Sequence, residues 1–357
     1  MTAFAEDLSH ALTPALRTGL LQASLRRMVG TAVIAATCSL SLPAHAVDLT
    51  GAGSTFVFPI LWKWTAAYHE KTGAKINYRS IGSGAGIAQV KAGSATFGAS
   101  DKPLGSEELQ AACLMQFPIV VGGIVPVVNI DGASPGSLKF DGHLLADIFI
   151  GKVTQWNDAE IAALNPGVAL PAQPITVVHR LDASGTTFNF ANFLSKSSEA
   201  WKAKVGSDTL VRWPVGVGGT GNDGVANQVN YLPGSIGYVE LSYATRHKMK
   251  YALVKNRAGA FVEPSPASFE AAAAGTEWKN DDFYEIITDA PGEASWPIAA
   301  TTFVLMPKAP PDQAAGQEAL SFFRWALANG QADARKLDYV PLPLVEQIEA
   351  YWARAGR

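Results

Sequence analysis

Gly-Ala-Gly-Ser-Thr-Phe occupies residues 51–56, just before a stretch, 60–71, whose apolar residues recur at helical spacing behind Pro59. A helix begins with backbone N–H groups that lack an intrahelical partner, and it carries a partial positive charge there. Glycines let a ligand approach those groups closely, and Ser or Thr adds an O–H donor. The segment therefore predicts a loop before a helix that can hold a ligand rich in hydrogen-bond acceptors.

Three further segments combine small residues with hydroxyls in the same way. They are Ile-Gly-Ser-Gly-Ala-Gly at 81–86, Gly-Ala-Ser-Asp at 98–101 and Arg-Leu-Asp-Ala-Ser-Gly-Thr-Thr at 180–187. Several such loops in one chain indicate a tetrahedral anion surrounded by donors, with one arginine to offset its charge. The carboxylate of Asp101, in the same kind of loop, is the unusual component.

Between these loops the chain alternates strand-like and helix-like stretches, which is typical of an α/β fold. We expect strands over 75–79, 117–129 and 175–179, an apolar run over 296–306, and helices over 87–92, 188–194 and 317–328. Ligands of open α/β sheets lie where strand ends meet helix starts. Because the four segments form two groups far apart in sequence, we expect two lobes that contribute to one cleft.

The bulk composition excludes several classes of protein. The 357 residues are 48% hydrophobic and 17% charged, which provides enough core for two domains. The formal net charge is −3, so no basic excess points to nucleic acid. We expect neither a cofactor nor a metal, because the histidines are scattered without metal-ligand spacing.

The N-terminus has the pattern of a targeting segment. Arg26 and Arg27 precede an uncharged stretch, 28–42, and then Pro-Ala-His-Ala, so we expect a signal peptide over 1–46 with cleavage after Ala46. The alternatives are a helix that stays on the protein and lipidation of Cys38. Cleavage would leave 25 basic and 29 acidic residues, a net charge of −4, so local dipoles rather than overall charge must attract an anion.

At these same segments the sequence resembles the periplasmic phosphate-binding proteins of bacterial phosphate ABC transporters. Further similar stretches are Gln-Phe-Pro at 116–118, 151–158, 218–224, 232–240 and Trp-Pro-Ile at 296–298. The resemblance spans about residues 48–352. It implies a two-lobed α/β solute-binding fold of type II with the ligand cleft between the lobes. It also implies lobe 1 over 47–127, lobe 2 over 128–298 and a return to lobe 1 over 299–357.

The resemblance also implies a function and a set of ligand residues. The chain is expected to be a monomeric, non-enzymatic periplasmic carrier that binds inorganic phosphate with high affinity. It would deliver phosphate to permease subunits of the inner membrane, which work with a cytoplasmic ATPase. The matching phosphate-binding positions are Thr55, Phe56, Ser83, Asp101, Arg180, Ser184, Gly185 and Thr186, with Asp182 as the supporting partner of Arg180. Phe56 and Gly185 would act through their backbone N–H groups.

The residue types make chemical sense for this ligand. Phosphate at neutral pH carries at least one O–H, whereas sulfate carries none. A buried Asp101 carboxylate can accept that O–H, but it would meet only lone pairs and like charge on sulfate. The planar guanidinium of Arg180 can make a paired contact with phosphate oxygens.

Other interpretations remain beside this one. A secreted phosphatase-like hydrolase could use the same donors, although no histidine is placed by sequence to activate Ser83 or Ser184. An extracellular adhesion or sensing role is a third, weaker option. The stretch 216–221 fits G-x-G-x-x-G, but Trp213-Pro214 precedes it, so we expect a glycine-rich loop rather than a dinucleotide site.

Overall fold

The structure is a computed structural model that describes residues 48–276, 278 and 282–355. The predicted signal peptide therefore lies outside the described residues. Strands and helices alternate along the first part of the chain, as predicted for an α/β protein. The strands are β1 Asp48–Gly53, β2 Lys75–Ser80, β3 Phe97–Ser100, β4 Leu114–Asn129, β5 Lys139–Phe140, β6 Thr176–Arg180, β7 Val217–Gly219, β8 Ser235–Glu240, β9 Lys250–Tyr251, β10 Leu253–Lys255, β11 Phe261–Val262, β12 Ala299–Pro307 and β13 Val340–Pro341.

Helices connect and cover these strands. They are α2 Phe58–Thr72, α3 Ser83–Lys91, α4 Ser106–Ala111, α5 Gly142–Phe149, α6 Ala159–Leu164, α7 Gly185–Ser197, α8 Glu199–Lys204, α9 Gly221–Tyr231, α10 Leu241–Arg246, α11 Pro266–Ala274, α12 Gln313–Asn329, α13 Gln331–Lys336 and α14 Val345–Arg354. The predicted helices over 60–71, 87–92, 188–194 and 317–328 are confirmed as parts of α2, α3, α7 and α12. Local signals fix α2, since a proline stands in its first turn and Gly73 ends it in the left-handed conformation.

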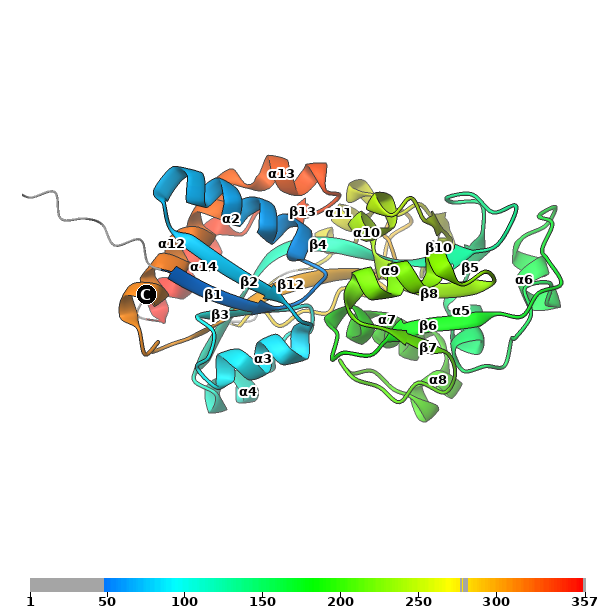
Figure 1. Ribbon diagram of the computed structural model, residues 1–357, viewed down its shortest axis with the longest axis horizontal. Helices are drawn as coiled ribbons and strands as arrows, with labels where there is room; N and C mark the ends of the chain where they lie inside the picture. The colour runs from blue at the N-terminus through cyan, green and yellow to red at the C-terminus, as the bar shows by residue number, and fades with distance from the viewer. Residues whose placement is uncertain (1–47, 277, 279–281, 356–357) are drawn as a thin grey trace, which may run out of the picture. The chain divides into compact units, whose positions relative to one another are not determined.

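The main sheet has the strand order β2-β1-β3-β12-β4-β8-β6-β7, and β9 and β13 pair with β4. β1 pairs in parallel with β2 and β3, and β6 pairs in parallel with β7 and β8. β4 and β12 connect these two parallel groups, and Figure 1 shows them running between β1–β3 in blue and cyan and β6–β8 in green. β4 pairs with β12 through its first ten residues and with β8 through its last six.

The long strand β4 is buried along nearly its whole length, as the apolar and β-branched residues of 117–129 predicted, and it begins three residues earlier than predicted. Two glycines in it allow large rings to lie directly on the backbone. A Cβ on Gly122 would lie within 3.0 Å of the Phe56 ring, and one on Gly123 would lie within 3.0 Å of the Phe269 ring. Because the side chain of Phe56 is fully buried against β4, the loop that carries Phe56 is fixed to the centre of the sheet.

One expectation about the backbone is wrong. The glycine-rich stretch 216–221 is not a loop, because Val217–Gly219 forms β7 and α9 begins at Gly221. Pairing with β6 supplies the backbone hydrogen bonds that this short segment could not provide alone. The absence of side chains lets β7 and α9 approach closely, since a Cβ on Gly219 would lie within 3.0 Å of backbone atoms of Gly224 and Val225. The lobe boundaries at 127/128 and 298/299 stay a prediction.

Candidate functional site

The four predicted segments lie at the carboxyl ends of β1, β2, β3 and β6. Gly53 at the end of β1 is in register with Ser80 of β2 and Ala99 of β3, so the loops after these strands start side by side. The fourth segment follows β6, whose last residue is Arg180. A fifth loop, which follows β7 and leads into α9, joins them through hydrogen bonds to Thr55 and Asp182. Helix N-termini therefore gather around the predicted ligand residues.

The carboxylate of Asp101 lies buried among hydroxyl donors. Ser54 Oγ donates to its Oδ1 at 2.8 Å and its Oδ2 at 2.6 Å, Thr302 Oγ1 donates to Oδ1 at 2.7 Å, and Ser83 Oγ lies 3.4 Å from Oδ2. Burial raises the pKa of Asp101 to about 6, although these hydrogen bonds and the charge of Arg180 oppose the shift. The group is therefore mainly ionised at neutral pH and can accept a further hydrogen bond.

Arg180 is buried, with 2% of its surface exposed, and is paired with Asp182. Its Nε donates to Asp182 Oδ1 at 2.8 Å, its Nη2 donates to Asp182 Oδ2, and its Nη1 donates to Thr186 Oγ1 at 3.3 Å. Burial alone would raise the pKa of Asp182, but the hydrogen bond and charge of Arg180 outweigh burial and lower it. The guanidinium is thus held in one orientation, and its carboxylate partner stays ionised.

The N-terminus of α7 contributes three of the predicted residues. Ser184 is the N-cap, and its Oγ accepts the N–H of Thr187 at 3.1 Å. Gly185 and Thr186 follow as the first two helical residues, whose N–H groups have no partner within the helix. A Cβ on Gly185 would lie within 3.0 Å of Ser83 Oγ and Asp101 Oδ2, so this close approach requires glycine.

Thr55 and Phe56 lie in the loop between β1 and α2. Thr55 Oγ1 accepts hydrogen bonds from the backbone N–H and Nδ2 of Asn222, at 3.3 and 2.8 Å. The N–H of Phe56, predicted to reach the ligand, donates to Ser54 Oγ at 3.0 Å. The hydroxyl of Tyr339 donates to the carbonyl of Phe56 at 2.6 Å, and that of Tyr243 donates to the carbonyl of Thr55 at 2.6 Å. These bonds hold the backbone of the loop in place.

The structure brings all nine predicted residues into one cluster, in which all but the partly exposed Asp182 are buried. Contacts run from Thr55 through Asn222 to Thr186 and Arg180, and from Gly185 to Ser83 and Asp101. Four further polar residues of this cluster were not predicted as site residues: Ser54, Asn189, Asn222 and Thr302.

The sequence carried a signal for some of these residues but not for all. Ser54 stands inside the first motif, and Asn222 stands at the opening of a helix behind glycines. Asn189 lies in the predicted helix of the fourth segment, where its Nδ2 donates to the Asp101 carbonyl at 2.6 Å. Thr302 lies in a buried apolar strand and carried no signal, because its role depends on β12 pairing with β3.

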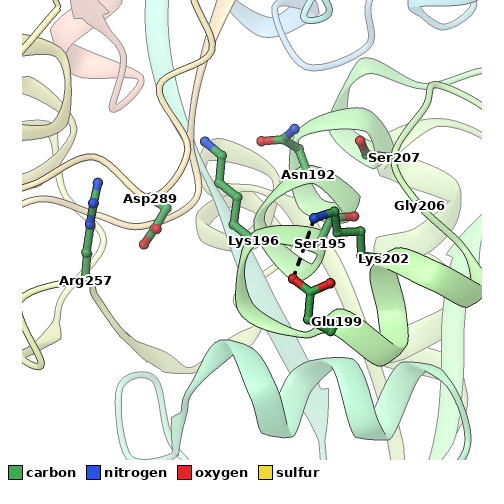
Figure 2. Close-up of a pocket in the computed structure, with 9 residues that line it drawn as sticks. All are labelled: Asn192, Ser195, Lys196, Glu199, Lys202, Gly206, Ser207, Arg257 and Asp289. Atoms are coloured by element: carbon green, nitrogen blue, oxygen red, sulfur yellow. Dashed lines mark ion pairs between the residues drawn. The ribbon is translucent and has the colours of Figure 1, made fainter.

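A separate cavity of about 580 Å³ lies at the far end of α7, and Figure 2 shows its lining. Lys196, Arg257 and Lys202 face it together with Asp289 and Glu199, and none of the nine predicted residues lines it. Lys202 and Glu199 form an ion pair of 3.6 Å in which both side chains are exposed. Because charges of both signs line the cavity and its Lys202–Glu199 pair is exposed, the cavity is a weaker candidate for holding an anion than the buried cluster.

The described part of the chain shows neither a group of metal ligands nor a serine of the ligand set that is activated by a histidine. Over 48–276, 278 and 282–355, no three His, Cys, Asp or Glu residues are grouped as a metal site would require. In the same residues, Ser83 Oγ bonds with Asp101 and Ser184 Oγ accepts from Thr187, and no histidine bonds to either hydroxyl. None of the described helices is long and apolar enough to cross a bilayer.

Comparison with known proteins identifies the family. The chain is 56% identical over 310 residues to the phosphate-binding protein PstS of Xylella fastidiosa strain Temecula1, which covers 86% of this chain and 85% of that protein. It is 48% identical to the phosphate-binding protein PstS of Haemophilus influenzae, over 87% of this chain and 93% of that one. The profile of the PBP superfamily domain matches residues 36–329. The chain belongs to the PstS family of this superfamily.

Solved structures show the same fold as this PstS-family chain. A high affinity periplasmic phosphate-binding protein, bound with phosphate, matches with a TM-score of 0.67 at 21% identity, over 86% of this chain and 92% of that one. A phosphate binding protein from Stenotrophomonas maltophilia matches with a TM-score of 0.63 at 20% identity, over 87% and 94%. The PstS-family chain has the two-lobed, type II α/β fold that the sequence predicted.

Proposed function

We propose that this chain binds inorganic phosphate and delivers it to an ABC import permease. One observation carries the proposal: the carboxylate of Asp101 is buried among hydroxyl donors, whereas the other carboxylate of the cluster, Asp182, is paired with Arg180. That arrangement suits an oxyanion that itself bears a hydrogen. Membership of the PstS family supports the choice of phosphate, since its relatives are named for binding phosphate.

The roles of the site residues follow from their chemistry. Hydroxyl groups of Thr55, Ser83, Ser184 and Thr186 and the N–H groups of Phe56 and Gly185 would donate to phosphate oxygens. The Phe56 N–H, which donates to Ser54 Oγ in this structure, would have to exchange that acceptor for the ligand. Arg180 would make the paired contact, with its orientation set by Asp182. Asp101 would accept the phosphate O–H and repel sulfate, which has no hydrogen to offer.

The same proposal includes the transport context. The protein would be exported by a signal peptide over 1–46, act in the periplasm as a monomer, and meet permease subunits served by a cytoplasmic ATPase. Two lobes provide the two conformations that capture and release require, and we keep the division at 47–127, 128–298 and 299–357 as part of this proposal. Mass spectrometry of the exported protein should find Val47 as its first residue.

We do not propose a hydrolase. A phosphatase would need a nucleophile with an adjacent base or a metal centre. Ser83 and Ser184, the two serines of the predicted ligand set, make their hydrogen bonds with Asp101 and with the N–H of Thr187. The relatives that match over most of the chain are named as binding proteins.

Calorimetric titration of the phosphate-stripped chain starting at Val47, with phosphate and then sulfate, tests the proposal. We expect one-to-one binding of phosphate and no heat from sulfate at neutral pH. A parallel assay with p-nitrophenyl phosphate should show no release of nitrophenol. Silence toward phosphate would overturn the proposal, and ester hydrolysis would replace it with the hydrolase.

A further inference from the structure

Asn222 contacts hydroxyls from two of the predicted ligand segments. It is the second residue of α9 and is fully buried. Its Nδ2 donates to Thr55 Oγ1 at 2.8 Å and to Thr186 Oγ1 at 3.2 Å, and its backbone N–H also donates to Thr55 Oγ1, at 3.3 Å. One side chain thus joins two hydroxyls that are far apart in sequence.

The orientation of the Asn222 amide is fixed by its third neighbour. The backbone N–H of Glu240 lies 3.0 Å from Asn222 Oδ1. A backbone N–H can only donate, so the oxygen of the amide must face Glu240 and the nitrogen must face the two threonines. Both hydrogens of Nδ2 are therefore used on Thr55 and Thr186.

Asn222 occupies acceptor positions of the Thr55 and Thr186 hydroxyls. A hydroxyl has two acceptor lone pairs and one hydrogen to donate. Thr55 Oγ1 accepts from the backbone and side chain of Asn222, and Thr186 Oγ1 accepts from Asn222 and from Arg180 Nη1. With both lone pairs occupied on each oxygen, each threonine retains its own O–H to offer to a ligand.

We propose that Asn222 is a positioning residue that makes Thr55 and Thr186 obligatory donors toward the ligand. The inference rests on the proposed phosphate site and deepens it. Oxygens of the anion that face these threonines must carry no hydrogen, because no lone pair is left there to accept one. The proton of bound phosphate is then directed to Asp101, so Asn222 fixes which oxygen carries it.

The test measures phosphate affinity by calorimetry, with Asn227→Ala, an exposed residue of the same helix, as the matched control. We expect Asn222→Ala to weaken phosphate binding about 10- to 100-fold, the scale of one or two lost hydrogen bonds. Asn227→Ala should bind like the parent. Sulfate should remain rejected by Asn222→Ala, since Asp101 is untouched.

A double-mutant cycle separates positioning from a general structural effect. If Asn222 acts through the threonines, its replacement should cost several-fold less in a Thr55→Val or Thr186→Val background than in the parent. Equal losses in all backgrounds would overturn the proposal. If Asn222→Ala does not fold, the isosteric Asn222→Asp replaces it in the test. The new carboxylate still accepts the Glu240 N–H, but it also accepts hydrogen bonds from the Thr55 and Thr186 hydroxyls, which are then not available to the ligand. Asn222→Asp should therefore lose at least as much phosphate affinity as Asn222→Ala, and a phosphate affinity equal to that of the parent would overturn the proposal.

Phosphate binding by the parent chain distinguishes failure of the proposed function from failure of the role proposed for Asn222. Absence of phosphate binding by the parent and by Asn227→Ala would overturn the proposed function, and the role of Asn222 with it. Tight binding by the parent with additive losses in the cycle would overturn the role of Asn222 alone.

Discussion

Asp101 combines two properties that a buried carboxylate seldom has together. It is removed from solvent, which raises its pKa to about 6, yet hydroxyls from Ser54, Ser83 and Thr302 stabilise its charge. At neutral pH it is therefore a charged acceptor that solvent does not screen. Discrimination between phosphate and sulfate would depend on this one group.

Asp101→Asn should reduce the rejection of sulfate. The new amide can donate to a sulfate oxygen and removes the like charge, so we expect the phosphate-to-sulfate affinity ratio to fall about 10- to 100-fold. Competition titrations on the parent and the variant measure that ratio. Asp223→Asn, which alters an exposed carboxylate, is the control. If the Asp101 variant still rejects sulfate as the parent does, the role assigned to Asp101 is wrong.

The parent should lose part of the same discrimination in acid. Below a pH of about 6, Asp101 becomes protonated in the free protein and can donate to sulfate. We expect sulfate to compete measurably at about pH 5 but not at about pH 8, whereas the sulfate affinity of Asp101→Asn should vary much less over this range. Titrations at the two pH values check this, and rejection of sulfate at both values by the parent would contradict it.

The structure brings together the residues that the sequence predicted for the site, but several of their hydrogen-bond partners were not predicted. Asp101, Arg180 and Ser184 stand in short motifs whose composition indicates anion chemistry. Thr302 and Asn222 act because β12 and α9 are brought beside those motifs by strand pairing, which no local pattern reveals. The engagement of the Phe56 N–H by Ser54 Oγ likewise depends on a loop conformation that was not predictable from composition.

Helix α7 shows how an element positions the site. Its N-cap, Ser184, fixes the first turn, and Gly185 lets that turn lie against Ser83 and Asp101. The sequence predicted this helix only from Phe188, because glycine and two threonines do not favour a helical interior. The start of α3 at Ser83 was missed for the same reason, and it is stabilised by tertiary contact, since the Gly84 N–H donates to the Ala183 carbonyl at 2.9 Å.

Gly185→Ala should disturb this contact between elements. The added methyl group would overlap Ser83 Oγ and Asp101 Oδ2, so α7 must move away from them. We expect phosphate affinity to fall at least about tenfold and unfolding free energy to fall by about 1–3 kcal/mol, the usual scale of overpacking. Calorimetry and thermal melting measure both. Gly105→Ala, where nothing lies within 4 Å of the added atom, should change neither. Unchanged phosphate affinity in Gly185→Ala would show that the site tolerates the shift.

At the scale of the whole chain, Glu240 connects segments that are distant in sequence. It ends β8, and its carboxyl accepts from the Ser242 N–H at 3.0 Å and lies 3.0 Å from the Tyr339 hydroxyl, which also donates to the Phe56 carbonyl. Burial raises the pKa of Glu240 to about 8, against the hydrogen bonds from Ser242 and Tyr339. At neutral pH Glu240 is therefore mainly protonated.

Glu240→Gln should remove a pH dependence of stability. Because the folded pKa lies above the ordinary value of 4.5, the folded state holds this proton more tightly. The stabilisation is fully present below about pH 4.5 and is lost as pH rises through about 8, at no more than about 1.4 kcal/mol per pH unit. Urea unfolding from about pH 5 to 9 should show the parent losing stability relative to the variant as pH rises. If the unfolding free energies of the parent and the variant change in parallel with pH, Glu240 does not titrate in this range. Glu346→Gln, which replaces an exposed glutamate, is the control.

The two-lobed fold was predictable from sequence in outline. Two groups of motifs far apart in sequence predicted two lobes, and the sheet contains two groups of parallel strands. The pairing partner of β4 changes from β12 to β8 along the strand. This change was not predictable, because both halves of β4 are mainly apolar.

The burial of Arg180 has a consequence for the medium in which the protein works. The guanidinium of Arg180 exposes only 2% of its surface, so mobile ions of the solvent screen its attraction for a bound anion much less than they screen surface lysines, for which the Debye length is about 8–10 Å. A titration in dilute buffer and one in concentrated sodium chloride should give nearly the same dissociation constant. Phosphate should associate somewhat faster in concentrated sodium chloride, because the salt screens the repulsion between the anion and the net negative charge of the protein. The affinity of such a protein would be nearly the same in seawater and in rainwater.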